Sequence, residues 1–181
     1  IIANRCRGTK ELPLVIYGAE VKSVIGDVLV LCPHPIRIFK DITKLIDVSN
    51  DNNCILVPAH PYDLLRCGVG SYVRLKNWDA IEVFNSSSDP LSNIITYLVA
   101  RNLGKPLLAN SDAHVAEMIG SSYNIIYVSK LTIENVLESI RNGFIEHVGR
   151  YSLRGYMGKI SWSLKRVITL GTQPMLPELN Y

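Results

Sequence analysis

Short apolar runs alternate along this chain with segments of helical pattern, and this alternation limits its fold more than any other feature. Most runs are rich in Val, Ile and Leu without strict polar alternation, which is typical of strands buried on both faces of a parallel sheet. Strands that alternate with helices predict repeated βαβ units and an α/β fold. The predicted strands span residues 14–17, 27–32, 54–59, 80–85, 106–110 and 124–129.

Helices are predicted between several of these strands. In the clearest one, Asp89 can cap the first turn and Pro90 occupies the first helical position. Thr132 is the expected cap of another helix, because Glu134 follows in its first turn. The predicted helices span residues 35–47, 89–104 and 132–141.

The length and composition indicate one domain with a separate C-terminal segment. The chain has 181 residues, of which 48% are hydrophobic, enough to build a real core. We expect the domain to span residues 1–150. Basic residues among apolar ones predict an amphipathic helix over 152–170, within a segment 151–181 that packs back on the domain rather than on a partner or a membrane. The net charge of +3 is too small to indicate nucleic-acid binding by itself.

The four cysteines and the hydropathy pattern bear on location. The cysteines show no CxxC spacing, and Cys32 and Cys54 lie in apolar runs where a free thiol behaves as a small hydrophobic side chain. Free thiols favour a reducing, cytoplasmic location. No apolar run reaches 18 residues, so we expect no transmembrane span and no membrane partner. The chain begins at Ile1 in what reads as the end of a helix, and we expect further residues upstream.

Polar side chains follow four of the predicted strands at the point where each strand ends. They are Glu20, His60, Asn85 and the pair Asp112 and His114. Because the carboxyl ends of parallel strands meet at one edge of a sheet or barrel, these side chains are expected to converge. Carboxylates and imidazoles together suit Zn, Mn or Fe. Asn85 is a candidate for orienting a substrate, with turn capping as the alternative.

Other polar residues receive simpler interpretations. His34 lies between two prolines, and His147 follows the last predicted helix, so both are interpreted as structural or surface residues. Arg66 and Arg74 follow the His60 strand and could contact a substrate phosphate, but surface solvation is the simpler interpretation.

Four segments in this order and spacing resemble the polymerase and histidinol phosphatase (PHP) family: VIYGAEV, ILVPAHPYD, AIEVFNSS and LLANSDAHVAEMIG. The resemblance covers roughly residues 10 to 130. It implies a distorted (β/α)7 TIM-like barrel, here without its N-terminal strands. It also implies a site for two or three divalent ions at the carboxyl end of the barrel, and phosphoester hydrolysis.

The resemblance also assigns roles to individual residues. Glu20 matches the glutamate that bridges metal ions, His60 matches the imidazole of a His-Pro motif, and Asp112 and His114 match the last two ligands. The family's N-terminal His-x-His motif and later Asp-His pair have no counterpart in these 181 residues. We expect both to lie upstream of Ile1.

These observations favour a metal-dependent phosphoesterase that uses a metal-activated water. The expected substrate is a small phosphate ester or nucleotide; nucleic acid is not indicated. The alternative is a catalytically inactive barrel of the same type that serves as a binding or assembly subunit, like the protein subunit of ribonuclease P. An unrelated α/β protein with a chance Asp-x-His is the third interpretation.

Overall fold

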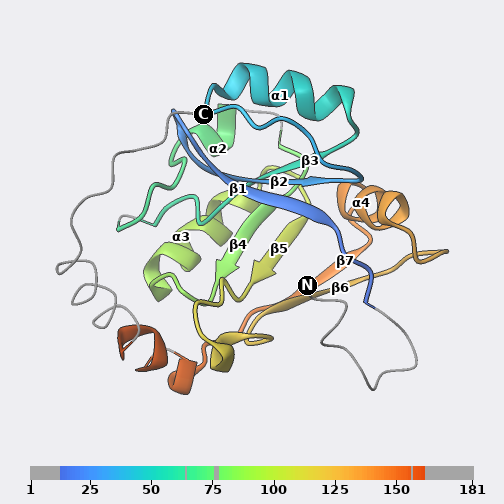
Figure 1. Cartoon of the computed structure of the whole chain (residues 1–181). Coiled ribbons are helices and arrows are strands. Elements are labelled where there is room, and N and C mark those ends of the chain that lie inside the picture. The colour runs from blue at the N-terminus through green and yellow to red at the C-terminus, as the bar shows by residue number, and fades with distance from the viewer. Residues whose placement is uncertain (1–12, 64, 76–77, 156, 162–181) are drawn as a thin grey trace, which may run out of the picture.

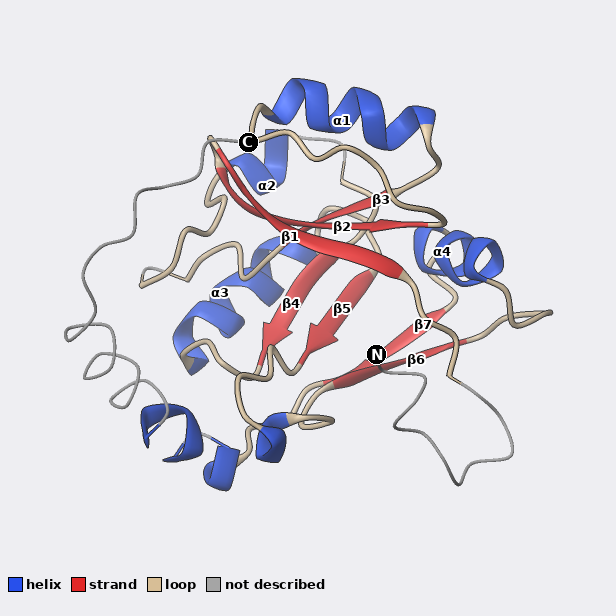
Figure 2. Ribbon diagram, viewed as in Figure 1, coloured by secondary structure: helices blue, strands red, loops and turns tan. Residues whose placement is uncertain are grey.

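The computed structural model describes residues 13–63, 65–75, 78–155 and 157–161. In this part of the chain, three small sheets pack together with helices between and outside them (Figure 1). Figure 2 shows the first sheet lying across the other strands, with helix α1 (Ile42–Asp51) on its outer side. None of the helices in the described ranges is long and apolar enough to cross a membrane.

The first sheet is antiparallel, in the order β1-β2-β3. Strands β1 (Tyr17–Ser23) and β2 (Gly26–Cys32) form a hairpin in which Ser23 pairs with Gly26. Gly26 has a φ of 132°, which only glycine adopts without strain, and so it allows this tight reversal. Strand β3 (Ile55–Pro58) then pairs with β2 on its other edge.

The second sheet is a single βαβ unit. Strand β4 (Ile81–Asn85), helix α3 (Pro90–Ala100) and strand β5 (Leu107–Asn110) follow in sequence, and the two strands pair in parallel. Asp89 caps α3 by accepting a hydrogen bond from the Ser92 amide at 2.9 Å. The helix predicted over 89–104 is therefore confirmed, with a shorter extent.

The third sheet pairs the last two described strands. Strand β6 (Tyr123–Ile126) and strand β7 (Ile145–Val148) are antiparallel and joined through helix α4 (Ile133–Arg141), which Thr132 caps. Two short helices lie between strands, α2 (Tyr72–Leu75) and the 3-10 helix η1 (Ala116–Met118).

Two apolar cores form because β2 and β3 bury both of their faces. Val28, Val30 and Leu56 point into a core shared with α1, α2 and β4. Leu29 and Val57, on the opposite face, contact a second core with β5 and α4. The continuous apolar runs of the sequence are explained by this double burial, although these strands are antiparallel.

The expected (β/α)7 TIM-like barrel is wrong: the described strands form three separate sheets, and no closed barrel. One reason is the hairpin, which leaves no crossover helix between β1 and β2. Another is that neighbouring sheets are joined by hydrogen bonds from side chains, where a closed barrel would have backbone hydrogen bonds between strands. The side-chain oxygen of Asn124 accepts a hydrogen bond from the Ala109 backbone amide, and its side-chain nitrogen donates to the Ala109 carbonyl, both at 2.9 Å. The Asp79 carboxylate likewise accepts from the Leu56 amide at 2.8 Å.

Several element boundaries also differ from those predicted. The first strand was placed at 14–17 but spans Tyr17–Ser23, so Glu20 lies within a strand and not after one. Helix α1 begins at Ile42, where Asp41 caps it, later than the predicted start at residue 35. Residues 153–155 and 157–161 are helical, and Gly155 lies against Met118. The rest of the predicted tail helix lies outside the described residues.

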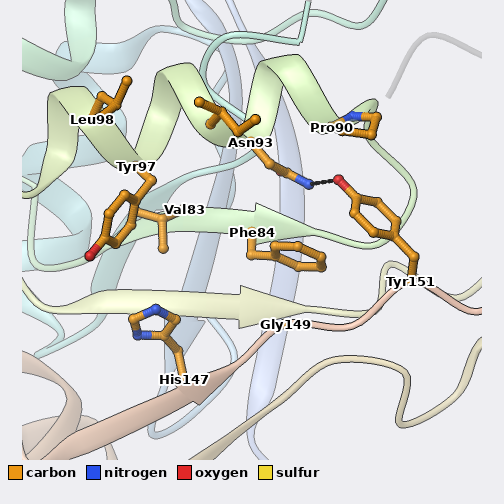
Figure 3. A pocket seen from close by; sticks show the side chains of 10 residues that line it. Val83, Phe84, Pro90, Asn93, Tyr97, Leu98, His147, Gly149 and Tyr151 are labelled. Atoms are coloured by element: carbon orange, nitrogen blue, oxygen red, sulfur yellow. Dashed lines mark hydrogen bonds between the residues drawn. The ribbon is translucent and has the colours of Figure 1, made fainter.

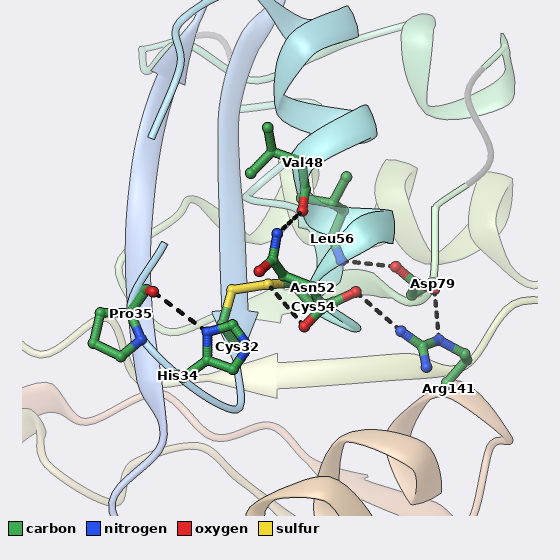
Figure 4. Close-up of a disulfide and its surroundings, with 9 residues drawn as sticks. All are labelled: Cys32, His34, Pro35, Val48, Asn52, Cys54, Leu56, Asp79 and Arg141. Atoms are coloured by element: carbon green, nitrogen blue, oxygen red, sulfur yellow. Dashed lines mark hydrogen bonds and ion pairs between the residues drawn. A yellow bond between two sulfur atoms is a disulfide. The ribbon is translucent and has the colours of Figure 1, made fainter. Parts of the chain in front are cut away.

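Cys32 and Cys54 form a disulfide between the end of β2 and the residue before β3 (Figure 4). Both had been interpreted as free thiols, because each lies in an apolar run. The antiparallel pairing of β2 with β3 brings the two Cα atoms to 4.2 Å. Disulfides persist in oxidising compartments, so the cysteines no longer support a reducing location, and cytoplasmic location stays a prediction.

Candidate metal centre

Three residues that could bind a metal ion come together where the first sheet meets β4. Glu20 lies on β1, Asp27 on β2, and His60 directly after β3. Lys22 pairs with Asp27 across the hairpin, which makes Glu20 and Asp27 diagonal neighbours on one face. The Ala59 amide donates to the Asp27 carbonyl at 3.0 Å, so the pairing with β2 brings His60 beside Asp27.

The three side chains are close enough to share one cation. His60 Nε2 lies 3.4 Å from Glu20 Oε1 and 3.7 Å from Asp27 Oδ2. One ligand atom from each residue lies within 4.8 Å of the other two. Asp27 and His60 are buried, whereas Glu20 is open to solvent on one side. A cation bound here would therefore be buried on the side of Asp27 and His60 and accessible to solvent on the side of Glu20.

The two carboxylates experience different environments. The hydrogen bond with His60 lowers the pKa of Glu20. Burial raises the pKa of Asp27, and the negative charge of Glu20 raises it further. Two carboxylates beside a buried imidazole carry an excess of negative charge, which a divalent cation would neutralise.

Unpartnered polar atoms test whether these residues fit a metal ion. Asp27 Oδ1 and His60 Nδ1 are both buried and have no hydrogen-bond partner among the described residues. Such atoms are rare in folded proteins, because leaving one unsatisfied costs about 1–3 kcal/mol. The donor set of two carboxylates and one imidazole also matches the preferences of Zn, Mn or Fe. The residues fit a divalent ion of this kind.

A second buried carboxylate holds the backbone of His60 in place. Glu82 Oε2 accepts the His60 amide at 2.6 Å, and Glu82 Oε1 accepts the Asn110 side-chain amide at 2.6 Å. Burial raises the pKa of Glu82. His60 has a φ of 32°, a left-handed conformation that non-glycine residues adopt only where surroundings enforce it. The hydrogen bond from the His60 amide to Glu82 helps to hold this backbone conformation.

A cavity of about 410 Å³ extends from this cluster between the sheets. Residues from each of the strands β1 to β7 line this cavity. The strands therefore surround one space, although they belong to three separate hydrogen-bonded sheets. Glu20, His60 and Glu82 line it together with Asn85 and Asp112.

The structure separates the predicted ligands into two groups. Glu20 and His60 lie together, as expected of a shared site. Asp112 lines the same cavity, but its Oδ2 pairs with Arg66 Nη2 at 2.6 Å. His114 is more exposed, and its Nδ1 lies 2.8 Å from the Asp112 carbonyl. Asp112 has a φ of 45°, so it also adopts a left-handed conformation.

Asn85 is buried at the end of β4 and is held on several sides. Its side-chain nitrogen donates to Glu82 Oε2 at 3.2 Å, and its oxygen accepts from the Ser87 amide at 2.8 Å. The second of these bonds is the turn-capping role that the sequence left open. Asn85 also lines the cavity.

Another hollow, of about 440 Å³, lies between α3 and β7 (Figure 3). Phe84 and Tyr97 line it, and Asn93 donates to the Tyr151 hydroxyl at 2.7 Å. It is mostly apolar and holds His147 but none of the three clustered ligands. The clustered ligands therefore lie at the His60 cavity and not in this hollow.

Comparison with known proteins agrees with the expected family. The sequence model of a family described as PHP-associated matches residues 92–145, from within α3 to the beginning of β7. The match supports the resemblance to the PHP family over this segment of the chain. The matched PHP-associated segment contains Asp112 and His114, whereas Glu20, Asp27 and His60 lie outside it.

A solved structure is similar in fold to this chain. It is described as the crystal structure of PsfC from Pseudomonas syringae PB-5123, with a TM-score of 0.60 and 16% identity. The alignment covers 84% of this chain and 65% of the PsfC chain, so this chain spans less than two thirds of that protein. At this identity the likeness concerns the fold alone. No curated protein matches the sequence.

Sequence reasoning missed two residues of this candidate site, Asp27 and Glu82. Asp27 is the first residue of the strand predicted over 27–32, and Glu82 lies within the strand predicted over 80–85. The available signal was a single carboxylate inside a strand that otherwise reads as buried on both faces. Buried carboxylates need partners, and so such a position indicates a network or a bound cation.

Proposed function

We propose that this chain is part of a metal-dependent phosphoesterase, with its metal centre at Glu20, Asp27 and His60. The observation that carries the proposal is the convergence of these three ligand atoms within 4.8 Å in a buried position. The match of residues 92–145 to the PHP-associated family supports phosphoester hydrolysis as the proposed reaction. The proposal extends to Asp112 and His114 as further ligands, because Asp112 lines the same cavity.

In this proposal, the residues of the chain bind the divalent ion and hold its ligands in position. The carboxylates of Glu20 and Asp27 supply negative charge for a divalent ion, and His60 supplies a neutral nitrogen ligand. Glu82 accepts the His60 amide and so fixes the backbone from which the imidazole projects. When bound, Zn, Mn or Fe acts as a Lewis acid and lowers the pKa of a coordinated water. The clustered triad provides for one ion; the two or three ions of the family remain part of the proposal.

The substrate would reach the site from the Glu20 side, since Glu20 is exposed while Asp27 and His60 are buried. Asn85 is proposed to orient it, although its amide already donates to Glu82. A small phosphate ester or nucleotide fits a cavity of about 410 Å³.

The test is hydrolysis of p-nitrophenyl phosphate with added Mn²⁺ or Zn²⁺. Wild type should release p-nitrophenol only with metal, and His60→Ala should reduce kcat/KM by about 100-fold or more while retaining cooperative unfolding. His147→Ala is the matched control, because His147 is an exposed histidine outside the cluster. Tight metal binding without turnover would favour the binding-subunit alternative. Equal activity in His60→Ala would contradict the site.

A further inference from the structure

A second hollow, of about 610 Å³, adjoins the candidate metal cavity at the Arg66–Asp112 ion pair. Arg66 lines this hollow, and its partner Asp112 lines the metal cavity. Ser87 and Lys159 also line the hollow, and Lys159 comes from the C-terminal segment, far along the chain. Ser87 Oγ, in the wall of the hollow, donates to the carbonyl of Asp112, in the wall of the metal cavity, at 3.0 Å.

The wall of this hollow has hydrogen-bond donors without acceptors. Arg66 Nη1 and Ser88 Oγ are buried and have no hydrogen-bond partner in the described residues. Lys159 Nζ donates to the Ser87 carbonyl at 3.2 Å, which uses one of its three donors. A bound group that accepts hydrogen bonds would satisfy these atoms, and an oxyanion does so best.

Charges of both signs surround these donors. Burial lowers the pKa of Lys159 and the nearby charge of Arg66 lowers it further, while the charges of Asp112 and Asp63 act in the opposite direction. Asp63 and Asp89 also line the hollow. Their oxygens already serve the backbone: Asp63 accepts the Leu65 amide at 3.0 Å, and Asp89 caps α3. Arg66 already has Asp112 as its charge partner, whereas Lys159 forms no ion pair with any described residue, so Lys159 and the free Nη1 of Arg66 are the groups available to a bound anion.

We infer that Arg66 and Lys159 form a subsite for a second anionic group on the substrate. The inference rests on the proposed function, because the metal centre would hold the phosphate that is cleaved. The preferred substrate is then a phosphate ester whose alcohol part carries a carboxylate or a second phosphate. Arg66 suits this role because its fork can serve the Asp112 carboxylate and the substrate anion at once.

The inference is tested with three esters and the full chain in Mn²⁺. Glycerol 1-phosphate carries one anionic group, 3-phosphoglycerate adds a carboxylate, and propane-1,3-diol bisphosphate adds a phosphate. Wild type should prefer one of the last two, and the better one identifies the anion. Lys159→Met should raise KM for that ester by about tenfold, the worth of one charge-assisted hydrogen bond. Turnover of glycerol 1-phosphate should stay unchanged, and Lys159→Arg should restore the preference.

The control is Lys130→Met, which removes an exposed lysine outside both spaces. No preference in wild type, or equal losses on all three esters in Lys159→Met, would overturn the subsite while leaving the hydrolase proposal intact. If wild type cleaves none of the three, the hydrolase proposal fails. Titration calorimetry with 3-phosphoglycerate and the bisphosphate then decides the subsite separately. Weaker binding to Lys159→Met supports it, and equal binding overturns it.

Discussion

The guanidinium of Arg66 lies 2.6 Å from the carboxylate of Asp112, and both side chains are largely buried, with 23% and 18% of their surface exposed. This ion pair joins the loop after β3 to the loop after β5. It places a cation beside the candidate metal centre, where its charge also lowers the pKa of Glu20.

Breaking this ion pair should destabilise the domain in a non-additive way. Asp112→Asn leaves a partly buried guanidinium without its charge partner, and we expect a loss of about 1–3 kcal/mol in the free energy of unfolding. Arg66→Met in the same chain should recover part of that loss, because both charges are then gone. Urea unfolding of the two single variants and the double variant measures the coupling. Strictly additive losses would show that the pair contributes no interaction energy.

Gly68 should be required for the conformation of the His60 loop. A Cβ at this position would lie 2.5 Å from the Pro61 carbonyl oxygen and 2.6 Å from the His60 carbonyl oxygen. Gly68→Ala should therefore cost about 1–3 kcal/mol of stability and weaken metal binding as well. Gly70→Ala is the control for crowding, since a Cβ there meets nothing within 4 Å, although its φ of 56° adds some strain. Wild-type stability and metal affinity in Gly68→Ala would contradict the geometry of this loop.

The cap of α3 should make stability depend on pH in the acid range. Hydrogen bonds from the Ser92 side chain and amide lower the pKa of Asp89 below its ordinary value of 3.8. Because the pKa is lowered in the folded state, the ionised Asp89 stabilises the fold fully at pH values above 3.8. This contribution is lost as the pH falls through the lowered pKa. Asp89→Ala should cost about 1 kcal/mol at pH 7.

The measurement for the cap is urea unfolding of wild type and Asp89→Ala at pH 7 and at pH 3. The difference between the two proteins should shrink at the lower pH. A difference that stays constant would mean that the Asp89 charge does not contribute.

The sequence predicted local structure better than it predicted pairing. Helix α3 was recognisable because Asp89 and Pro90 give start signals that act within one turn. The direction of β1 and β2 was not recognisable, because their apolar runs fit a parallel sheet as well as a doubly buried antiparallel one. The disulfide between Cys32 and Cys54 depends on the same pairing, so spacing in sequence could not reveal it.

The candidate site shows the same division. Glu20 and His60 carry motif signals that are readable in sequence, and the structure brings them to 3.4 Å. Asp27 reaches them only through the register of the hairpin, which sets it diagonally across from Glu20. The roles of Asp112 and His114 stay predictions, since Arg66 pairs with one and the other lies outside the cluster.

Direct metal binding tests the central claim most sharply. Equilibrium dialysis of the full chain against Mn²⁺ or Zn²⁺, with metal analysis of the protein, gives affinity and stoichiometry. We expect wild type and His147→Ala to bind at least one ion per chain, and Asp27→Asn to lose about tenfold or more in affinity. Wild type that binds no ion, or Asp27→Asn that binds as tightly as wild type, would contradict a metal centre at Glu20, Asp27 and His60.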